Sequence, residues 1–368
     1  MHRTGIADLP LHYGRAPSWL FQRMVKLAEG IVSVMVHDFG ANEVLHRLAD
    51  PFWFQALSCV LGFDWHSSGT TTVTSAALKS AIKPEVHGLA ILGGKGSAAR
   101  AVPEEIVKLQ AIFDINVEQL RYASKMTAKV DNAAIQDNYK LYQHAFFISE
   151  SGSWAVVQQG MNVASQYARR YHWFGAHVKS FVIEPHEAII GSVKLDRVLN
   201  MTSRESEEAR SVSLDLAREP TEKLEKMLKS LTWDRYQKTL ANWIEGESEV
   251  LPTIMVLPRR VDWEALRQAY EFQPKNYEEL LAINGIGPAT VRALALISEL
   301  IYGKSPSWRD PVKYSFAVGG KDGVPYPVDR KTMDKTIEVI KTGVEEAKVG
   351  REEKLKAIRR LKDFLPSH

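Results

Sequence analysis

Residues 276–303, NYEELLAINGIGPATVRALALISELIYG, constrain the fold more than any other stretch of this sequence. Asn276 is followed three residues later by a glutamate, which is typical of a helix start, and Pro288 suits the first turn of a second helix. Gly285 and Gly287 carry no side chain, so backbone N–H groups there can approach a phosphate at the positive end of the second helix. The stretch therefore predicts a short helix, a tight turn that can bind an anion, and a second helix.

This pattern resembles the helix-hairpin-helix motif, which clamps the DNA backbone without reading the bases. A phosphate contact of this kind positions a protein on DNA and carries no sequence information. The alternative is a structural αα-hairpin whose glycines only permit a tight turn. The resemblance implies DNA contacts from residues of the turn and the second helix, namely Asn284, Gly285, Ile286, Gly287, Ala289 and Thr290.

The composition is that of an ordinary globular protein. Hydrophobic residues make up 45% and charged residues 25% of the 368 residues, and a chain of this length suggests two domains. Apolar runs such as residues 31–36 are far too short to cross a bilayer, so no membrane contact is expected. The single cysteine, Cys59, excludes an internal disulfide and a multi-thiolate zinc site. We expect a cytoplasmic protein.

Strand and helix signals change near residue 200, which predicts an α+β fold in two domains. The N-terminal domain, residues 1–200, contains two runs rich in aromatic and β-branched residues, LYQHAFFIS and WAVVQQGM. The turn-forming sequence ESGS separates them, which predicts a β-hairpin within a sheet. A second strand pair is expected over residues 179–190. The C-terminal domain, residues 201–368, has mostly helical periodicity and contains residues 276–303.

A Gly/Pro-rich loop, residues 315–330, follows the predicted helix pair and brings Asp329 to the start of another predicted helix. This order is similar to that of the helix-hairpin-helix base-excision DNA glycosylases, whose catalytic aspartate follows such a loop. The resemblance implies a DNA-repair enzyme that cleaves a glycosidic bond without a cofactor, with Asp329 stabilising charge on the sugar or activating water. Asp310 matches the family spacing better. Ala289 stands where bifunctional members have a lysine, and Lys321 is the nearby lysine that would have to take that role.

Acidic and histidine side chains in the N-terminal half leave a second function open. A metal-dependent, structure-specific endonuclease would use such groups to hold Mg²⁺ or Mn²⁺ and activate water. The usual Glu-x-Lys signature of such nucleases is absent from the predicted strands. The alternative site comprises Asp137, His144, Glu150 and Gln158, with Asp131, Glu184 and His186 as further acidic or imidazole groups.

Two arginines lie in ARRYHWF, where basic residues alternate with aromatic ones. Arg169 and Arg170 are expected to contact the DNA backbone through their charge. A third hypothesis is therefore a DNA-binding protein without catalytic activity. DNA is the expected partner under all three hypotheses.

Three segments that lie far apart carry a second resemblance: TGIADLPLHYGRAPSWLFQRMVKLA, WAVVQQGM and DPVKYSFAVGGKDGVPYPVDRKTMD. Together they resemble the prokaryotic family known as domain of unknown function 763. This resemblance implies that both halves of the chain belong to one functional unit.

Overall fold

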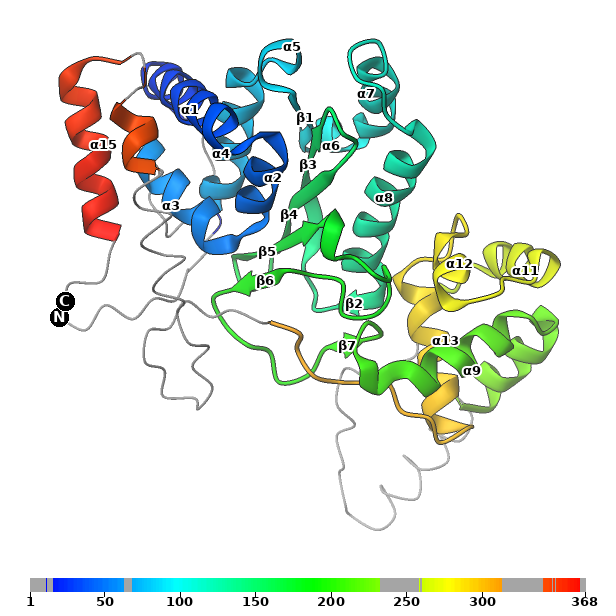
Figure 1. Cartoon of the computed structure of the whole chain (residues 1–368). Coiled ribbons are helices and arrows are strands. Elements are labelled where there is room, and N and C mark those ends of the chain that lie inside the picture. Colours follow the sequence, from blue (N-terminus) through cyan, green and yellow to red (C-terminus); the bar gives the residue numbers. More distant parts are fainter. Residues whose placement is uncertain are drawn as a thin grey trace, which may run out of the picture.

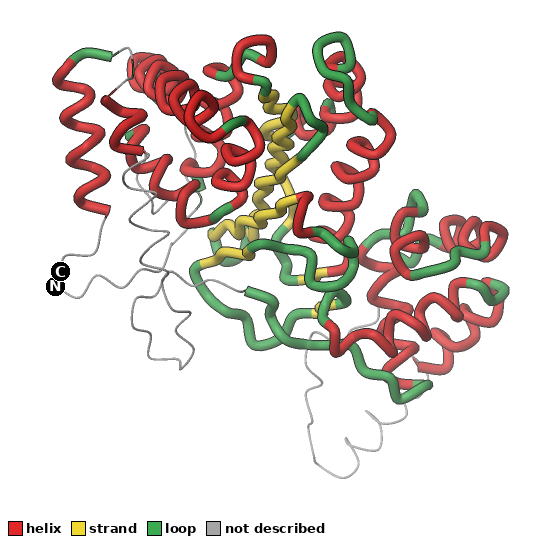
Figure 2. The backbone as a smooth tube through the Cα atoms, viewed as in Figure 1, coloured by secondary structure: helices red, strands yellow, loops and turns green. Residues whose placement is uncertain are grey.

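The structure is a computed structural model that describes residues 11, 16–62, 68–231, 258, 260–312, 340–345, 347 and 349–364. Its fold is α+β, as the sequence predicts, with helices on both sides of a central sheet (Figure 1 and Figure 2). Within these residues, no helix is both long enough and apolar enough to cross a membrane.

The central sheet is antiparallel, and its five strands have the order β1-β3-β4-β5-β6. The predicted hairpin is confirmed as β3 and β4, because aromatic and β-branched side chains suit a pleated, buried surface. The strand pair expected over residues 179–190 is wrong in its first part, where Pro185 lacks the N–H that a ladder needs. The strands are β1 (Leu89–Lys95), β2 (Ile135–Gln136), β3 (Lys140–Ser149), β4 (Trp154–Asn162), β5 (Tyr167–Phe174), β6 (Ala188–Gly191) and β7 (Leu199–Asn200), of which β2 and β7 pair separately.

Helices cover both faces of the sheet, so alternate residues of its strands are buried on opposite sides. Phe147 and Val157 belong to the first hydrophobic cluster, and Phe146 and Val156 to the second. The first cluster is completed by α1 (Ser18–Phe39), α2 (Ala41–Ala49), α3 (Pro51–Leu61), α4 (Gly69–Ala81) and α15 (Arg351–Phe364). The second is completed by α7 (Val102–Leu109), α8 (Val117–Lys129), η1 (Val130–Ala134), α9 (Glu207–Ala217), α11 (Trp263–Phe272), α12 (Tyr277–Ala282) and α13 (Pro288–Leu300). Shorter helices are α5 (Pro84–His87), α6 (Ser97–Arg100), η2 (Gly175–His177) and η3 (Arg204–Ser206), and residues 221–231 and 340–345 are also helical.

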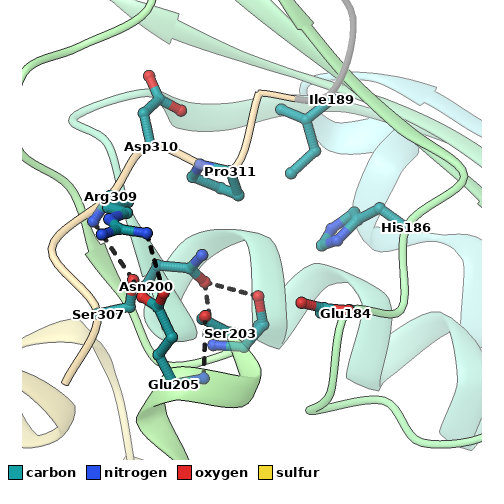
Figure 3. Close-up of a pocket in the computed structure, with 11 residues that line it drawn as sticks. Glu184, His186, Ile189, Asn200, Ser203, Glu205, Ser307, Arg309, Asp310 and Pro311 are labelled. Carbon is teal, nitrogen blue, oxygen red and sulfur yellow. Dashed lines mark hydrogen bonds and ion pairs between the residues drawn. The ribbon is translucent and has the colours of Figure 1, made fainter. Parts of the chain in front are cut away.

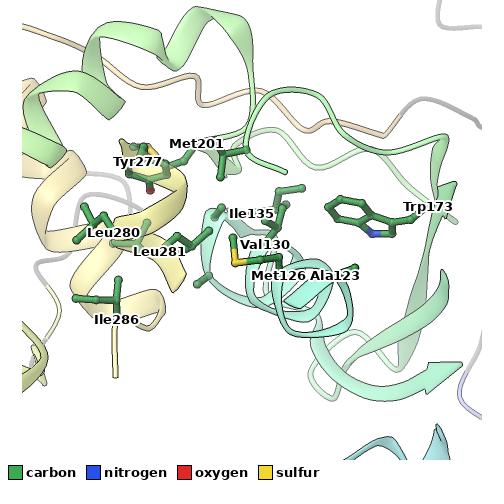
Figure 4. Close-up of a cluster of buried hydrophobic side chains, with 14 of the residues drawn as sticks. Ala123, Met126, Val130, Ile135, Trp173, Met201, Tyr277, Leu280, Leu281 and Ile286 are labelled. Atoms are coloured by element: carbon green, nitrogen blue, oxygen red, sulfur yellow. The ribbon is translucent and has the colours of Figure 1, made fainter. Parts of the chain in front are cut away.

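Both halves of the chain contribute to the second hydrophobic cluster. Figure 4 shows Met126 and Val130, from the end of α8 and the start of η1, beside Leu281 and Ile286 from α12 and the turn after it. The chain also returns to the N-terminal helices, because α15 packs on α3. The expected boundary at residue 200 stays a prediction, and the core crosses it.

The 276–303 stretch folds as two helices, α12 and α13, and residues 283–287 between them form the glycine turn. Asn276 caps α12 by accepting a hydrogen bond from the N–H of Glu279 at 2.8 Å. Pro288 occupies the first turn of α13. Gly285 has a φ of +84°, a conformation that residues with a Cβ rarely adopt. Local capping and turn chemistry therefore place the start of α13 directly behind residues without side chains.

Candidate functional site

The glycine turn presents backbone rather than side chains at the surface. Asn284 and Gly285 are exposed, and Gly287 and Ala289 are half-buried. The first N–H groups of a helix have no partner within that helix. The start of α13 is therefore reachable by a ligand that accepts hydrogen bonds.

Two of the six residues expected to contact DNA lie inside the protein instead. Ile286 is fully buried and belongs to the second hydrophobic cluster. Thr290 is also buried, and its hydroxyl accepts a hydrogen bond from the N–H of Asp262 at 3.3 Å. These two side chains anchor the glycine turn, and the ligand-facing part is limited to the other four positions.

Lys129, at the end of α8, holds the glycine turn from behind. Its ammonium group donates hydrogen bonds to the carbonyl oxygens of Ile283 and Ile286, both at 2.8 Å. Burial and the nearby charge of Lys125 lower the pKa of Lys129 to about 8. A positive charge thus lies directly beneath the turn and binds two of its carbonyl groups.

Gln136, in β2, fixes the start of α13 in the same way. Its amide nitrogen donates to the carbonyl oxygen of Pro288 at 2.7 Å, and its amide oxygen accepts from Nε of Arg292 at 2.8 Å. Lys129 and Gln136 therefore contact the glycine turn and the first turn of α13 from the same short region of the chain. Distant parts of the chain therefore support the glycine turn, with the Lys129 ammonium beneath it and the Asp262 carboxylate beside Gly285.

The expected DNA contacts from Arg169 and Arg170 are wrong, because both side chains are fully buried. They lie on β5, in the interior of a sheet whose two faces are covered by helices. The guanidinium of Arg170 donates to Gln55 at 2.9 Å and lies over the ring of Phe54. Burial lowers the pKa of Arg170 to about 9. Neither arginine can reach a DNA backbone at the surface.

Asp310, a candidate catalytic residue, is the main partner of Arg169. Its carboxylate accepts two hydrogen bonds from that guanidinium, at 3.0 and 2.8 Å. It also accepts from the N–H groups of Leu195 at 2.7 Å and Val312 at 3.1 Å. These four hydrogen bonds place the Asp310 carboxylate in a structural ion pair with Arg169. The other two catalytic candidates, Asp329 and Lys321, lie outside the described residues.

The four residues of the alternative nuclease site are not gathered in one place. His144 and Gln158 are hydrogen-bonded to each other at 2.8 Å inside the second cluster, where burial lowers the pKa of His144. Asp137 is bound to Arg169 at 2.9 Å, and Glu150 is exposed at the β3–β4 turn. Across the residues described here, no group of three or more His, Cys, Asp or Glu side chains is arranged to hold a metal ion.

A buried histidine–carboxylate pair lies between the sheet and the helical region that follows it. Asp131 is in η1, a π-helical turn, and such turns often occur at functional sites. Its carboxylate accepts hydrogen bonds from Nε2 of His186, from the indole N–H of Trp173 at 3.0 Å and from the amide of Gln158. Because a carboxylate only accepts, Nε2 of His186 carries the proton. The orientation of the imidazole is therefore fixed from behind.

His186 also lines a pocket of about 210 Å³ (Figure 3). In Figure 3 the imidazole of His186 and the carboxylate of Glu184 point into the pocket from the same side. Glu184 has a φ of +42°, an uncommon backbone conformation that is often found at functional sites. Polar residues of β7, η3 and the segment 307–311 form the opposite walls. The pocket is therefore a second candidate for ligand binding.

The chain matches the family model described as protein of unknown function (DUF763) over residues 5–328. The chain belongs to the DUF763 family. The match extends across residue 200, so both halves of the chain are parts of this family's common unit. No curated protein and no solved structure matches the chain. The resemblance of the C-terminal half to DNA glycosylases therefore has no support from these comparisons.

Several residues that define the site in this DUF763 member carried no local signal. Lys129 and Gln136 contact the glycine turn across more than 150 positions of sequence. His186 and Asp131 were recognisable only as separate polar groups, and their pairing depends on η1 lying beside the loop before β6. An aspartate near the end of a helix and a histidine beside a proline are too common to indicate a site.

Proposed function

We propose that the protein binds the phosphate backbone of DNA through the glycine turn and the first turn of α13. The exposed start of α13 supports this most directly, because Gly285 and Gly287 place no side chain between its N–H groups and solvent. The positive end of the helix dipole attracts anions at this position. Backbone N–H groups and phosphate oxygens form charge-assisted hydrogen bonds.

Nearby basic residues strengthen the proposal. Lys129 binds carbonyl groups of the turn, Arg292 lies one helical turn along α13 and donates to Gln136, and Lys125 is exposed on the preceding part of α8. Neutralising phosphates with such groups releases counterions, so affinity should fall as salt rises. Because these contacts reach only the backbone, binding should not depend on base sequence.

Ala289→Glu should weaken DNA binding by about tenfold or more, because juxtaposed like charges at an interface cost several kcal/mol. The substitution places a carboxylate among the N–H groups proposed to hold a phosphate. Ala289→Gln has nearly the same size without the charge and should lose much less affinity. Fluorescence anisotropy of a labelled duplex, measured at two salt concentrations, gives both dissociation constants.

Unfolding can be separated from loss of binding in this comparison. A glutamate in the first turn of a helix is favourable, so Ala289→Glu should melt at or above the temperature of the unmodified protein. Undiminished binding by Ala289→Glu, or equal losses in the two variants, would remove the glycine turn from the DNA interface.

A catalytic role in DNA repair is proposed in addition to this binding. Removal of a damaged or modified base needs a carboxylate near the sugar, and Asp329 is the candidate because Asp310 is held by Arg169. The alternatives are an endonuclease that requires Mg²⁺ or Mn²⁺ and a DNA-binding protein that forms no product. DNA binding by itself implies neither base removal nor strand cleavage.

A panel of damaged and branched oligonucleotides, incubated with and without EDTA, distinguishes the three. On a denaturing gel after alkali, base removal should give cleaved strands that persist in EDTA and disappear in Asp329→Asn. Cleavage that needs no alkali and stops in EDTA would favour the endonuclease. Retarded DNA with no product on any substrate would leave only the binding function.

A further inference from the structure

The pocket in Figure 3 combines apolar and hydrogen-bonding walls. Ile189 and Pro311 form an apolar side, while Asn200 and Ser203 bring amide and hydroxyl groups to the opposite side. A volume of about 210 Å³ is below the roughly 300–1,000 Å³ of pockets for drug-sized ligands. The pocket therefore suits one small ring system with an apolar face and a polar edge.

The charges around the pocket disfavour an anion. Arg309 is paired with Glu205 at 3.0 Å, and Glu184 is paired with Arg204 at 3.2 Å. Each positive group at the wall is thus matched by a carboxylate, which repels phosphate. A neutral nucleobase has the required features, because its faces stack on apolar groups and its edge both donates and accepts hydrogen bonds.

One short segment, residues 129–136, connects the pocket to the glycine turn. On one side, Lys129 and Gln136 bind the turn and the start of α13. On the other side, Asp131 binds His186, and Ile135 pairs with Asn200 in the β2–β7 ladder. A helical segment is about 10–12 Å thick, and one strand of DNA rises about 3.4 Å per nucleotide. A few nucleotides therefore span a segment of this thickness.

We infer that this pocket receives a single unstacked base of DNA held at the glycine turn, with His186 fixed by Asp131 at the edge of that base. The inference rests on the proposed DNA-binding function. Taking a base out of the stack costs a few kcal/mol, and least for a mismatched or damaged base. Occupancy of the pocket should therefore be highest for a base that is already poorly paired.

A duplex that contains one 2-aminopurine in a mismatch tests this inference, because the fluorescence of this base rises when it unstacks. The unmodified protein should raise the fluorescence several-fold, and should raise it less for a fully paired 2-aminopurine. Ser203→Phe fills the pocket and should abolish the rise while the protein still binds the duplex. Ser203→Ala leaves the pocket open and should keep most of the rise.

The possible results separate the two proposals. If the unmodified protein binds the duplex but fluorescence stays flat in mismatched, paired and single-stranded DNA, the base-binding pocket is overturned and DNA binding stands. An undiminished rise with Ser203→Phe would place the unstacked base elsewhere and overturn the inference as well. Failure to bind any duplex overturns the proposed function and, with it, the pocket. If Ser203→Phe does not fold, Glu205→Phe takes its place in the comparison. The Glu205 side chain lines the pocket and is 55% exposed, so a phenylalanine there blocks the entrance.

Discussion

Replacing Asp310 by alanine should lower the free energy of unfolding by about 3–5 kcal/mol, the usual effect of removing one partner of a buried ion pair. The side chains of Arg169 and Asp310 are fully buried. Although burial opposes its charge, the carboxylates of Asp137 and Asp310 raise the pKa of Arg169 above its usual range. The guanidinium therefore stays charged after the substitution and loses half of its compensation. Urea unfolding followed by circular dichroism measures the change.

An exposed ion pair provides the matched control for Asp310→Ala. Asp215 lies 3.6 Å from Arg218 on the surface of α9, with 69% of its side chain accessible. Asp215→Ala should change the unfolding free energy by about 1 kcal/mol or less, because solvent screens such pairs. If Asp310→Ala were as mild as Asp215→Ala, the ion pair would not be structural, and Asp310 would return as a catalytic candidate.

Adding a methyl group at Gly285 should destabilise the protein, whereas the same change at Gly287 should not. At Gly285 a Cβ would lie 2.7 Å from Cβ of Ala265 and 2.8 Å from the Asp262 carboxylate, at a φ of +84°. Left-handed backbone costs about 1–2 kcal/mol and overpacking about 1–3 kcal/mol, so Gly285→Ala should lose about 2–5 kcal/mol. At Gly287 the φ is −112°, and the nearest atom would be 3.7 Å away.

The two glycine variants also separate architecture from DNA contact. Gly287→Ala should fold with nearly unchanged stability, yet weaken DNA binding, because its methyl group covers the approach to the start of α13. Thermal melting and anisotropy on the same samples test both statements. If Gly287→Ala binds DNA as tightly as the unmodified protein, the turn serves only to reverse the chain, and the proposed function loses its main support.

Local sequence was sufficient for the elements that depend on neighbouring residues. Asn276 and Pro288 marked the starts of α12 and α13, because capping and proline act within one turn of helix. The β3–β4 hairpin followed from its aromatic and β-branched runs and from the turn between them. The absence of side chains at Gly285 and Gly287 was likewise evident from residue type alone.

Burial and long-range pairing were decided only by the tertiary structure. Arg169 and Arg170 have the local pattern of a basic surface, but the packing of distant helices on both faces of the sheet buries them. Arg169 then requires Asp310, a partner 141 positions away, and the glycine turn requires Lys129 from another helix. A strand has the same sequence alternation whether its faces meet water or helices. The sequence by itself therefore determined the secondary elements and the family, whereas packing alone determined which charged groups remain available to a ligand.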